Sequence, residues 1–305
     1  MRTRFFLTAL LAILLPALAG AQGKVSIPPV GTGFKPTHLT SYDPGNYQGM
    51  DCYKDYVLSC NHTGIANLWI LEGGKPRKIS RFNLASQGDA NHANVVSFGV
   101  ERFDRKDPMP LVYVSQCHKI PWNGLKDVLF VERIRPDLQS SELVQVIRYD
   151  DVNKDFGYAL QWVIDRRHKM LYGFGNTTGD RDIEGNRHRI IKFRLPKLSA
   201  GKEVVLRPED ALENYVVEDH GLSYATIGQG LCIHKGKLMM PTGVGNAEYP
   251  SWLFVWDLRK QRPVTVLDMG GGHTTGELED FAHYRKNLYL IQAQTGLYLM
   301  EYPEK

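Results

Sequence analysis

The sequence lacks the short motifs that identify most enzyme and cofactor sites. It contains no H-E-x-x-H, P-loop, G-x-S-x-G or EF-hand loop, which excludes the metalloprotease, nucleotide, serine-hydrolase and calcium sites that those motifs encode. Its 305 residues include only four cysteines, with no C-x-x-C unit and no recognisable disulfide framework. No long stretch has apolar residues at helical spacing. Function must therefore be inferred from the fold and from the side chains that the fold brings together.

The charge of the chain is nearly balanced. Its 37 Lys and Arg residues stand against 33 Asp and Glu residues, and the formal net charge is +4. The basic residues are scattered through predicted turns, where we expect them to be solvated; examples are Lys54, Arg166, Arg167 and Lys235. Binding to nucleic acid requires a concentrated basic face, so we expect no nucleic-acid partner.

Residues 1–21 have the pattern of a secretory signal peptide. Two early arginines precede an apolar run from Phe5 to Leu15, and small residues follow at A-x-A spacing. The run is too short to anchor the chain in a bilayer. We therefore expect a secreted or periplasmic protein without a membrane anchor, a monomer, whose residues 22–305 form one domain.

Five segments repeat one pattern, in which a polar turn joins two short apolar strands. They are QGMDCYKDYVLSC from Gln48, HANVVSFG from His92 with PLVYVSQC after an insertion, QWVIDRRHKMLYGFG from Gln161, QGLCIHKGKLMMPTG from Gln229 and EDFAHYRKNLYLIQA from Glu279. A third β-like run follows every copy, and a fourth follows most. Four-stranded sheets repeated in series are typical of a β-propeller. The sequence therefore predicts an all-β, five-bladed β-propeller.

Two features of the repeats concern the fourth strands. In the third blade the best match is the short run EVVL at Glu203. The fifth copy stops after three strands, which would leave an open edge able to pair with another chain. We expect a run from His38 to Tyr42 to supply the missing strand and close the ring. Four insertions, Val100 to Met109, His118 to Asp127, Thr177 to Arg187 and Lys197 to Ile227, are predicted to cover the faces.

Each innermost strand begins with a large hydrogen-bonding side chain. Because blades are arranged radially, equivalent positions should meet around one mouth of the central channel. The predicted ligand-binding residues are Gln48, His92, Asn94, Gln161, Gln229 and Glu279. Amides, an imidazole and one acid suit a hydroxyl-rich ligand, so we expect a glycan or cell-surface polymer as partner.

Other interpretations of these residues remain open. They can bond the backbone of a neighbouring blade or hold channel water, because unpaired buried polar groups are costly. Glu279 can also serve a hydrolase of sugars or nucleotides, or bind Ca²⁺ together with Glu277 and Asp280. The sequence selects no metal site, cofactor or catalytic residue. Trp122 lies in a polar insertion, where it could stack on a sugar.

The four cysteines are expected to be buried free thiols. Cys52 and Cys60 lie in one predicted hairpin, whose register places Cys52 opposite Val57. That register argues against a bridge between them, and a thiol packs well as a small hydrophobic group.

The repeats also resemble a known family. The segments HANVVSFG with PLVYVSQ, GQGLCIHKGKLMMPTGVG and ELEDFAHYRKNLYLI are similar to those of β-propellers found in teichoic acid biosynthesis protein C and in certain phage receptor-binding proteins. The resemblance covers roughly Tyr47 to Tyr302, and it implies a five-bladed propeller that binds a cell-surface polymer or carbohydrate. This chain departs from the family pattern at Leu278 and Asp280, where a proline and a glycine are usual.

Overall fold

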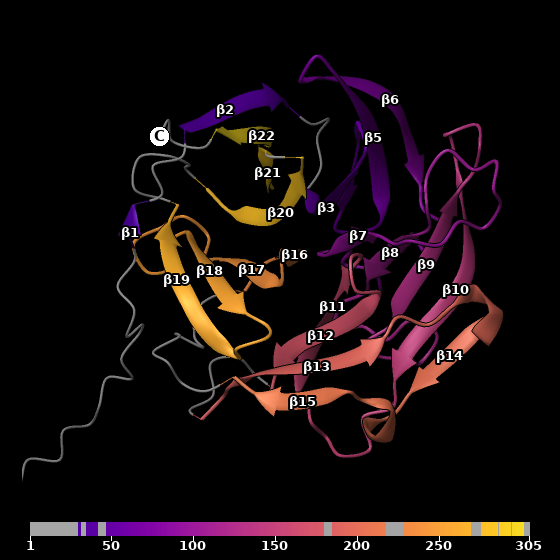
Figure 1. Ribbon diagram of the computed structural model, residues 1–305, viewed down its shortest axis with the longest axis vertical. Coiled ribbons are helices and arrows are strands. Elements are labelled where there is room, and N and C mark those ends of the chain that lie inside the picture. Colours follow the sequence, from indigo (N-terminus) through magenta and orange to yellow (C-terminus); the bar gives the residue numbers. More distant parts are fainter. Residues whose placement is uncertain are drawn as a thin grey trace, which may run out of the picture.

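The protein is an all-β ring of five small sheets, a five-bladed β-propeller, as the repeats predict (Figure 1). The computed structural model describes residues 30–31, 35–41, 47–179, 185–217, 228–269, 276–285, 287–293 and 295–301. Within these ranges the only helical elements are two short 3-10 segments, η1 (Leu198–Ala200) and η2 (Pro208–Asp210). The predicted signal peptide lies outside the described residues.

The five blades follow one another along the chain, each with its innermost strand first. Blade 1 contains β3 (Tyr47–Tyr53), β4 (Tyr56–Asn61), β5 (Ile65–Glu72) and β6 (Lys75–Asn83). Blade 2 contains β7 (Val96–Phe98), β8 (Val112–Ser115), β9 (Leu129–Ile134) and β10 (Ser141–Tyr149). Blade 3 contains β11 (Tyr158–Asp165), β12 (Met170–Asn176), β13 (His188–Arg194) and β15 (Glu213–Val216). Blade 4 contains β16 (Cys232–His234), β17 (Lys237–Thr242), β18 (Trp252–Asp257) and β19 (Arg262–Asp268). Blade 5 contains β20 (Leu278–Tyr284), β21 (Asn287–Gln292), β22 (Gly296–Glu301) and β2 (Lys35–Thr40).

The ring closes as predicted, through a strand from the N-terminal part of the chain. β2 pairs antiparallel with β22, with Thr37 opposite Leu299, so blade 5 combines segments from both ends of the sequence. Closure removes the open edge of β22. A short strand that the sequence did not predict, β1 (Val30–Gly31), pairs in parallel with β19 and extends blade 4.

The prediction for the fourth strand of blade 3 is wrong. The run EVVL forms β14 (Glu203–Leu206), which pairs in parallel with β10 of blade 2 as a fifth strand. The segment before β14 is held there because Gln145 Nε2 donates to the backbone oxygens of Lys197 at 3.0 Å and Gly201 at 2.7 Å. The chain then returns to blade 3, and β15, from a segment predicted as an insertion, pairs with β13.

The hydrophobic core lies between neighbouring blades. Leu58 of blade 1 packs in one buried cluster with Phe98 and Phe130 of blade 2. Trp162 of blade 3 is 1% exposed and belongs to a cluster shared with blade 2. Burial of each large side chain contributes roughly 1.5–3 kcal/mol, so contacts between blades contribute substantially to stability.

Side chains from one blade also bond the inner edge of the next. Asp280 of blade 5 accepts the backbone N–H of Met50 in blade 1 at 2.9 Å. Asp51 of blade 1 accepts Phe98 N at 2.7 Å, and Ser97 of blade 2 accepts Ile164 N at 3.4 Å. The inner strands have no neighbouring strand on the channel side, so these side chains satisfy backbone donors that would otherwise lack partners. The blades are thereby linked around the channel.

All four cysteines are free thiols. Cys52 pairs in register with Val57, as predicted. Cys52 and Cys60 are buried, whereas Cys117 and Cys232 are partly exposed, so the prediction that all four would be buried is only half confirmed.

Candidate functional site

The central channel has two openings, which differ in chemistry. The inner strands β3, β7, β11, β16 and β20 surround the centre of the ring (Figure 1). Each begins near the predicted polar residues and ends in a hairpin turn, except that β7 leads into the insertion before β8. We call the first end the rim opening and the second the hairpin opening. The six predicted residues, Gln48, His92, Asn94, Gln161, Gln229 and Glu279, are called the rim.

Several rim side chains meet across blades. Gln48 Nε2 donates to Glu279 Oε1 at 2.8 Å. Gln161 Nε2 donates to the backbone oxygen of Gln229 at 2.7 Å. Gln229 Nε2 donates to Glu277 Oε1 at 2.9 Å. Hydrogen bonds at the rim thus link blade 1 to blade 5, blade 3 to blade 4 and blade 4 to blade 5. These amides are almost wholly buried, so much of their bonding capacity is used within the protein.

Blade 2 joins the rim through Asn94 and Cys117. Burial, the largest effect, raises the pKa of the Cys117 thiol to about 12, and the nearby side chains of Gln161 and Asn94 oppose this rise. Asn94 is 5% exposed, and its Oδ1 has no hydrogen-bond partner among the described residues. A buried carbonyl oxygen without a donor is unusual in a folded protein and calls for water or a ligand. The rim therefore retains one acceptor that internal contacts leave unsatisfied.

Two histidines of blade 2, His92 and His118, lie close to each other near the rim. The His92 ring is half-buried and lies 5.8 Å from the His118 ring, centroid to centroid. Burial, followed by the charges of His118 and His62, lowers the pKa of His92 to about 4. His92 is therefore neutral at neutral pH and can donate one hydrogen bond and accept another.

Local backbone geometry places the rim residues. The ladders of β3 and β20 shift register between Tyr47 and Met50 and between Leu278 and Asp280. These β-bulges include Gln48 and Glu279, and a bulge redirects the side chain that it carries. The sequence repeats predicted the rim but gave no sign of the bulges.

Glycine follows two of the rim glutamines because the blades approach closely there. A Cβ on Gly49 would lie 2.4 Å from the backbone oxygen of Ala93 in the segment leading into blade 2. A Cβ on Gly230 would lie 2.5 Å from the carboxyl carbon of Asp280. Both distances are shorter than van der Waals contact, so the Gln-Gly pairs allow adjacent blades to meet near the axis.

Two residues beside the rim have strained backbones. Ala93 and Cys117 adopt φ angles of 48° and 38°. A residue other than glycine in this left-handed region costs on the order of 1–3 kcal/mol, and such residues cluster at functional sites. One of the strained residues, Ala93, lies between His92 and Asn94 in the sequence.

The three acidic residues near the rim, Glu277, Glu279 and Asp280, differ in their burial and in their hydrogen bonds. Burial, followed by the charge of Glu277, raises the pKa of Glu279 well above its usual value, although the Gln48 hydrogen bond opposes this. Glu277 is half-buried. Asp280 is fully buried and bonds backbone N–H groups of Met50 and Phe281, so it links blades rather than facing the rim opening.

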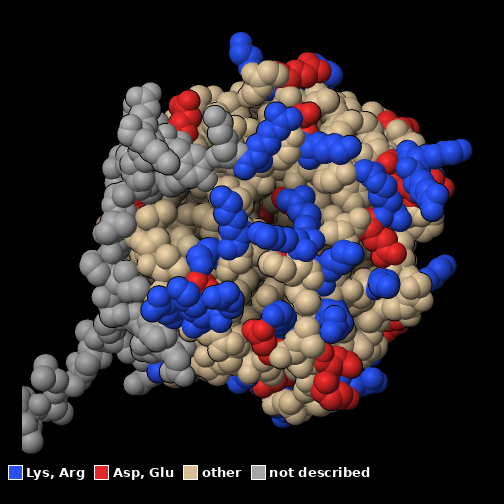
Figure 2. All heavy atoms as spheres, viewed as in Figure 1, with Lys and Arg blue, Asp and Glu red and all other residues tan. Residues whose placement is uncertain are grey.

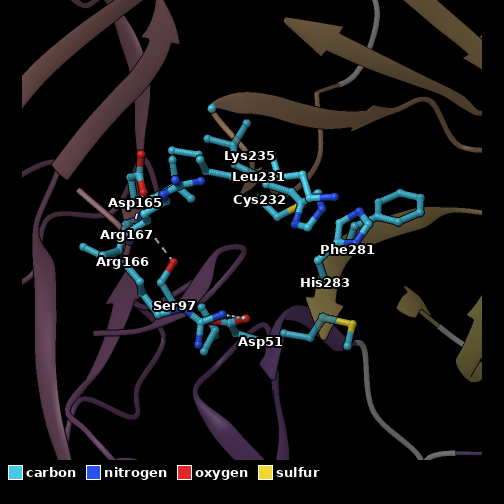
Figure 3. A pocket seen from close by; sticks show the side chains of 17 residues that line it. Asp51, Ser97, Asp165, Arg166, Arg167, Leu231, Cys232, Lys235, Phe281 and His283 are labelled. Atoms are coloured by element: carbon cyan, nitrogen blue, oxygen red, sulfur yellow. Dashed lines mark hydrogen bonds and ion pairs between the residues drawn. The ribbon is translucent and has the colours of Figure 1, made fainter. Parts of the chain in front are cut away.

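The hairpin opening contains a cavity that the sequence did not predict. Lys and Arg side chains gather around the centre of one face of the ring (Figure 2). At the hairpin opening a cavity of about 250 Å³ is lined by residues of all five inner strands. Its charged and aromatic lining includes Asp51, Asp165, Arg166, Arg167, His234, Lys235 and His283, many of which surround a common space in Figure 3. Three of the scattered basic turn residues, Arg166, Arg167 and Lys235, are thus brought together, and only their shared position within the repeats could have indicated this.

Other predictions have simpler outcomes. Trp122 is half-buried and packs edge-on against Phe130, with ring centroids 5.2 Å apart; it therefore contributes to the core around blade 2. Among the described residues, no three His, Cys, Asp or Glu side chains are arranged to hold a metal ion. No helix in the described ranges is long and apolar enough to cross a membrane.

Comparisons with known proteins give little beyond this geometry. No family model matches the sequence, and no curated protein matches it either. Among solved structures the chain is similar to the crystal structure of Myxococcus xanthus glutaminyl cyclase, with 13% identity and a TM-score of 0.46. The match covers 90% of this chain and 97% of that chain. The fold assignment rests on the five sheets themselves, and this likeness carries no inference about activity.

Proposed function

We propose that this chain is an exported binding protein that recognises a glycan or cell-surface polymer at the rim opening. In this proposal residues 1–21 are removed on export to the periplasm or beyond, and residues 22–305 act as a monomeric propeller domain. The resemblance of the repeats to teichoic acid biosynthesis protein C and phage receptor-binding propellers belongs to the proposal as well. The observation that carries it is the buried, unsatisfied Asn94 Oδ1 at the convergence of the rim.

The chemistry of the rim favours hydroxyl groups. Asn94 Oδ1 is an acceptor that needs a donor, and the neutral His92 ring offers both functions. The amides behind them are fixed by contacts between blades, so the site is already organised before a ligand binds. A preorganised polar site binds without the entropic cost of ordering its side chains. Sugar hydroxyls, which donate and accept, match this set.

The test is a screen of bacterial polysaccharides on a glycan array, followed by calorimetric titration of any glycan that binds. We expect His92→Ala to weaken binding roughly ten-fold, equal to about 1.4 kcal/mol. His168→Ala is the matched control, because His168 lies 55% exposed at the hairpin opening. The proposal fails if the wild type binds no glycan or if His92→Ala binds as tightly as the wild type.

A second candidate function is hydrolysis of a sugar substrate. Two carboxyl groups, Glu277 and Glu279, bond rim glutamines, and burial raises the pKa of Glu279 well above its usual value. Glycoside hydrolases use a pair of carboxyl groups, one of which has a raised pKa and serves as the acid. Turnover of a glycan that disappears in Glu279→Gln while binding persists would support this function. Binding without turnover in the wild type would exclude it for that glycan.

A further inference from the structure

We propose that the hairpin opening is a second binding site, separate from the rim, that takes a small organic oxyanion such as a sugar acid or a sugar phosphate. The cavity has about 250 Å³ of space, which suits a ligand of roughly monosaccharide size. All five blades contribute to its wall. The site lies at the opposite ends of the inner strands from the rim, so the two proposals stand or fall independently.

Three cations face this cavity, and two of them are unpaired. Arg167 and Lys235 are exposed, and neither side chain makes a hydrogen bond or ion pair with any residue that the structure describes. Arg166 is partly engaged: its NH1 donates to the backbone oxygen of Cys52 at 2.8 Å, and its NH2 lies 3.4 Å from Asp51 Oδ1. Its side chain is still 34% exposed. The cations come from turns of blades 3 and 4 on either side of the cavity.

The acids of the cavity are already occupied. Asp51 accepts the backbone N–H groups of Cys52 and Phe98, both at 2.7 Å. Asp165 accepts Arg167 N at 3.0 Å and His168 Nδ1 at 2.7 Å. These carboxylates are held by donors of the turns and of the links between blades, and neither forms an ion pair with Arg167 or Lys235 among the described residues. The lining contains three cations, Arg166, Arg167 and Lys235, against two acids, Asp51 and Asp165, so it keeps a positive excess that an incoming anion can pair.

The remaining wall is uncharged at neutral pH. The His234 and His283 rings stack with centroids 3.7 Å apart and planes at 12°. Burial, with the nearby charge of Lys235, lowers the pKa of both rings, that of His283 to about 3. The imidazoles thus present neutral donors and a flat surface beside the cations.

An apolar layer lies deeper in the cavity. It consists of one buried residue from each inner strand or its approach: Met50, Val96, Val163, Leu231 and Phe281. Charge pairs are stronger next to apolar, water-poor surfaces than in bulk water. Guanidinium groups pair with carboxylate and phosphate oxygens in a bidentate geometry. A small ligand with one oxyanion group can pair that group with the cations and place its remaining atoms against the apolar layer.

Calorimetric titration tests this site with four probes: glucuronate, glucose 6-phosphate, inorganic phosphate and neutral glucose. We expect one or both sugar anions to bind, glucose not to bind, and affinity to fall as salt rises, because exposed charge pairs are screened. The comparison of glucuronate with glucose 6-phosphate tells whether carboxylate or phosphate is preferred. Inorganic phosphate as tight as the sugar anions would show that no organic ligand is selected and would overturn the proposal, as would equal binding of glucose.

The decisive variant combines Arg167→Gln with Lys235→Gln. Because neither side chain has a partner within the described part of the chain, the variant should fold as the wild type, and we expect its affinity for the sugar anion to fall roughly ten-fold or more. Arg259→Gln with Lys260→Gln is the matched control, with the same charge change in an exposed turn at the outer edge of blade 4. Undiminished binding by the first pair, or equal loss in both pairs, contradicts the assignment. His92→Ala should leave this affinity unchanged, which separates the result from the rim.

Discussion

The link between blades 5 and 1 predicts a large effect of Asp280→Ala on stability. Asp280 is fully buried, and its two carboxylate oxygens accept Met50 N at 2.9 Å and Phe281 N at 2.8 Å. Removing the carboxyl leaves two buried N–H groups without acceptors, and each costs roughly 1–3 kcal/mol. Relief of the buried charge offsets part of this cost. We expect a net loss of about 2–4 kcal/mol in the free energy of unfolding at neutral pH.

Urea unfolding monitored by circular dichroism measures this loss as a lower midpoint at an unchanged slope. The variant Asp280→Asn retains one oxygen for Met50 N and should lose about half as much. Burial raises the pKa of Asp280 well above its usual value. The wild type therefore loses stability as pH rises from about 4 through that raised pKa, and the deficit of the Asn variant should shrink over the same interval. Glu209→Ala, at an exposed position, should stay within about 0.5 kcal/mol of the wild type. An equally small effect of Asp280→Ala would refute the linking role.

Three further perturbations test other parts of the structure. Gly49→Ala places a Cβ 2.4 Å from the Ala93 oxygen and should cost roughly 1–3 kcal/mol, measured by urea unfolding; a neutral result would contradict the close approach of blades 1 and 2. The pKa of His283 is lowered to about 3, below the usual 6.5, so the folded state loses stability as pH falls below about 6.5; His283→Gln should flatten this decline, and an unchanged pH profile of the midpoint would disprove it. Deleting β2 opens blade 5 and should produce association in analytical ultracentrifugation, whereas a stable monomer would show that closure is dispensable.

The sequence predicted the ring because its information is local and repeated. Each hairpin carries its own alternation of apolar residues and its own turn, and five copies leave few architectures that bury all of them. The closing strand around His38 followed from the missing edge of blade 5. The same logic brought Gln48, Gln161 and Glu279 to one opening, and the structure places them there.

The parts that the sequence did not predict depend on contacts between segments. EVVL at Glu203 has strong β-propensity, but its partner was decided by Gln145, which anchors the preceding segment beside blade 2. A strong β-propensity indicates that a segment forms a strand, but it does not indicate which strand that segment pairs with. The basic turns at Arg166 and Lys235 belong to different repeats, and neither turn alone indicates that they converge around a cavity. The β-bulges decide whether the rim amides bond one another or face solvent. The sequence repeats give no sign of these bulges.

The most direct test of the account is a crystal structure of the protein grown with glucuronate. The account predicts a bound sugar acid in the hairpin opening, with its carboxylate within hydrogen-bond distance of Arg167 and Lys235 and its ring against the His234 and His283 stack. A sugar acid bound only elsewhere, or an empty cavity with both cations turned to solvent at saturating ligand, would contradict it.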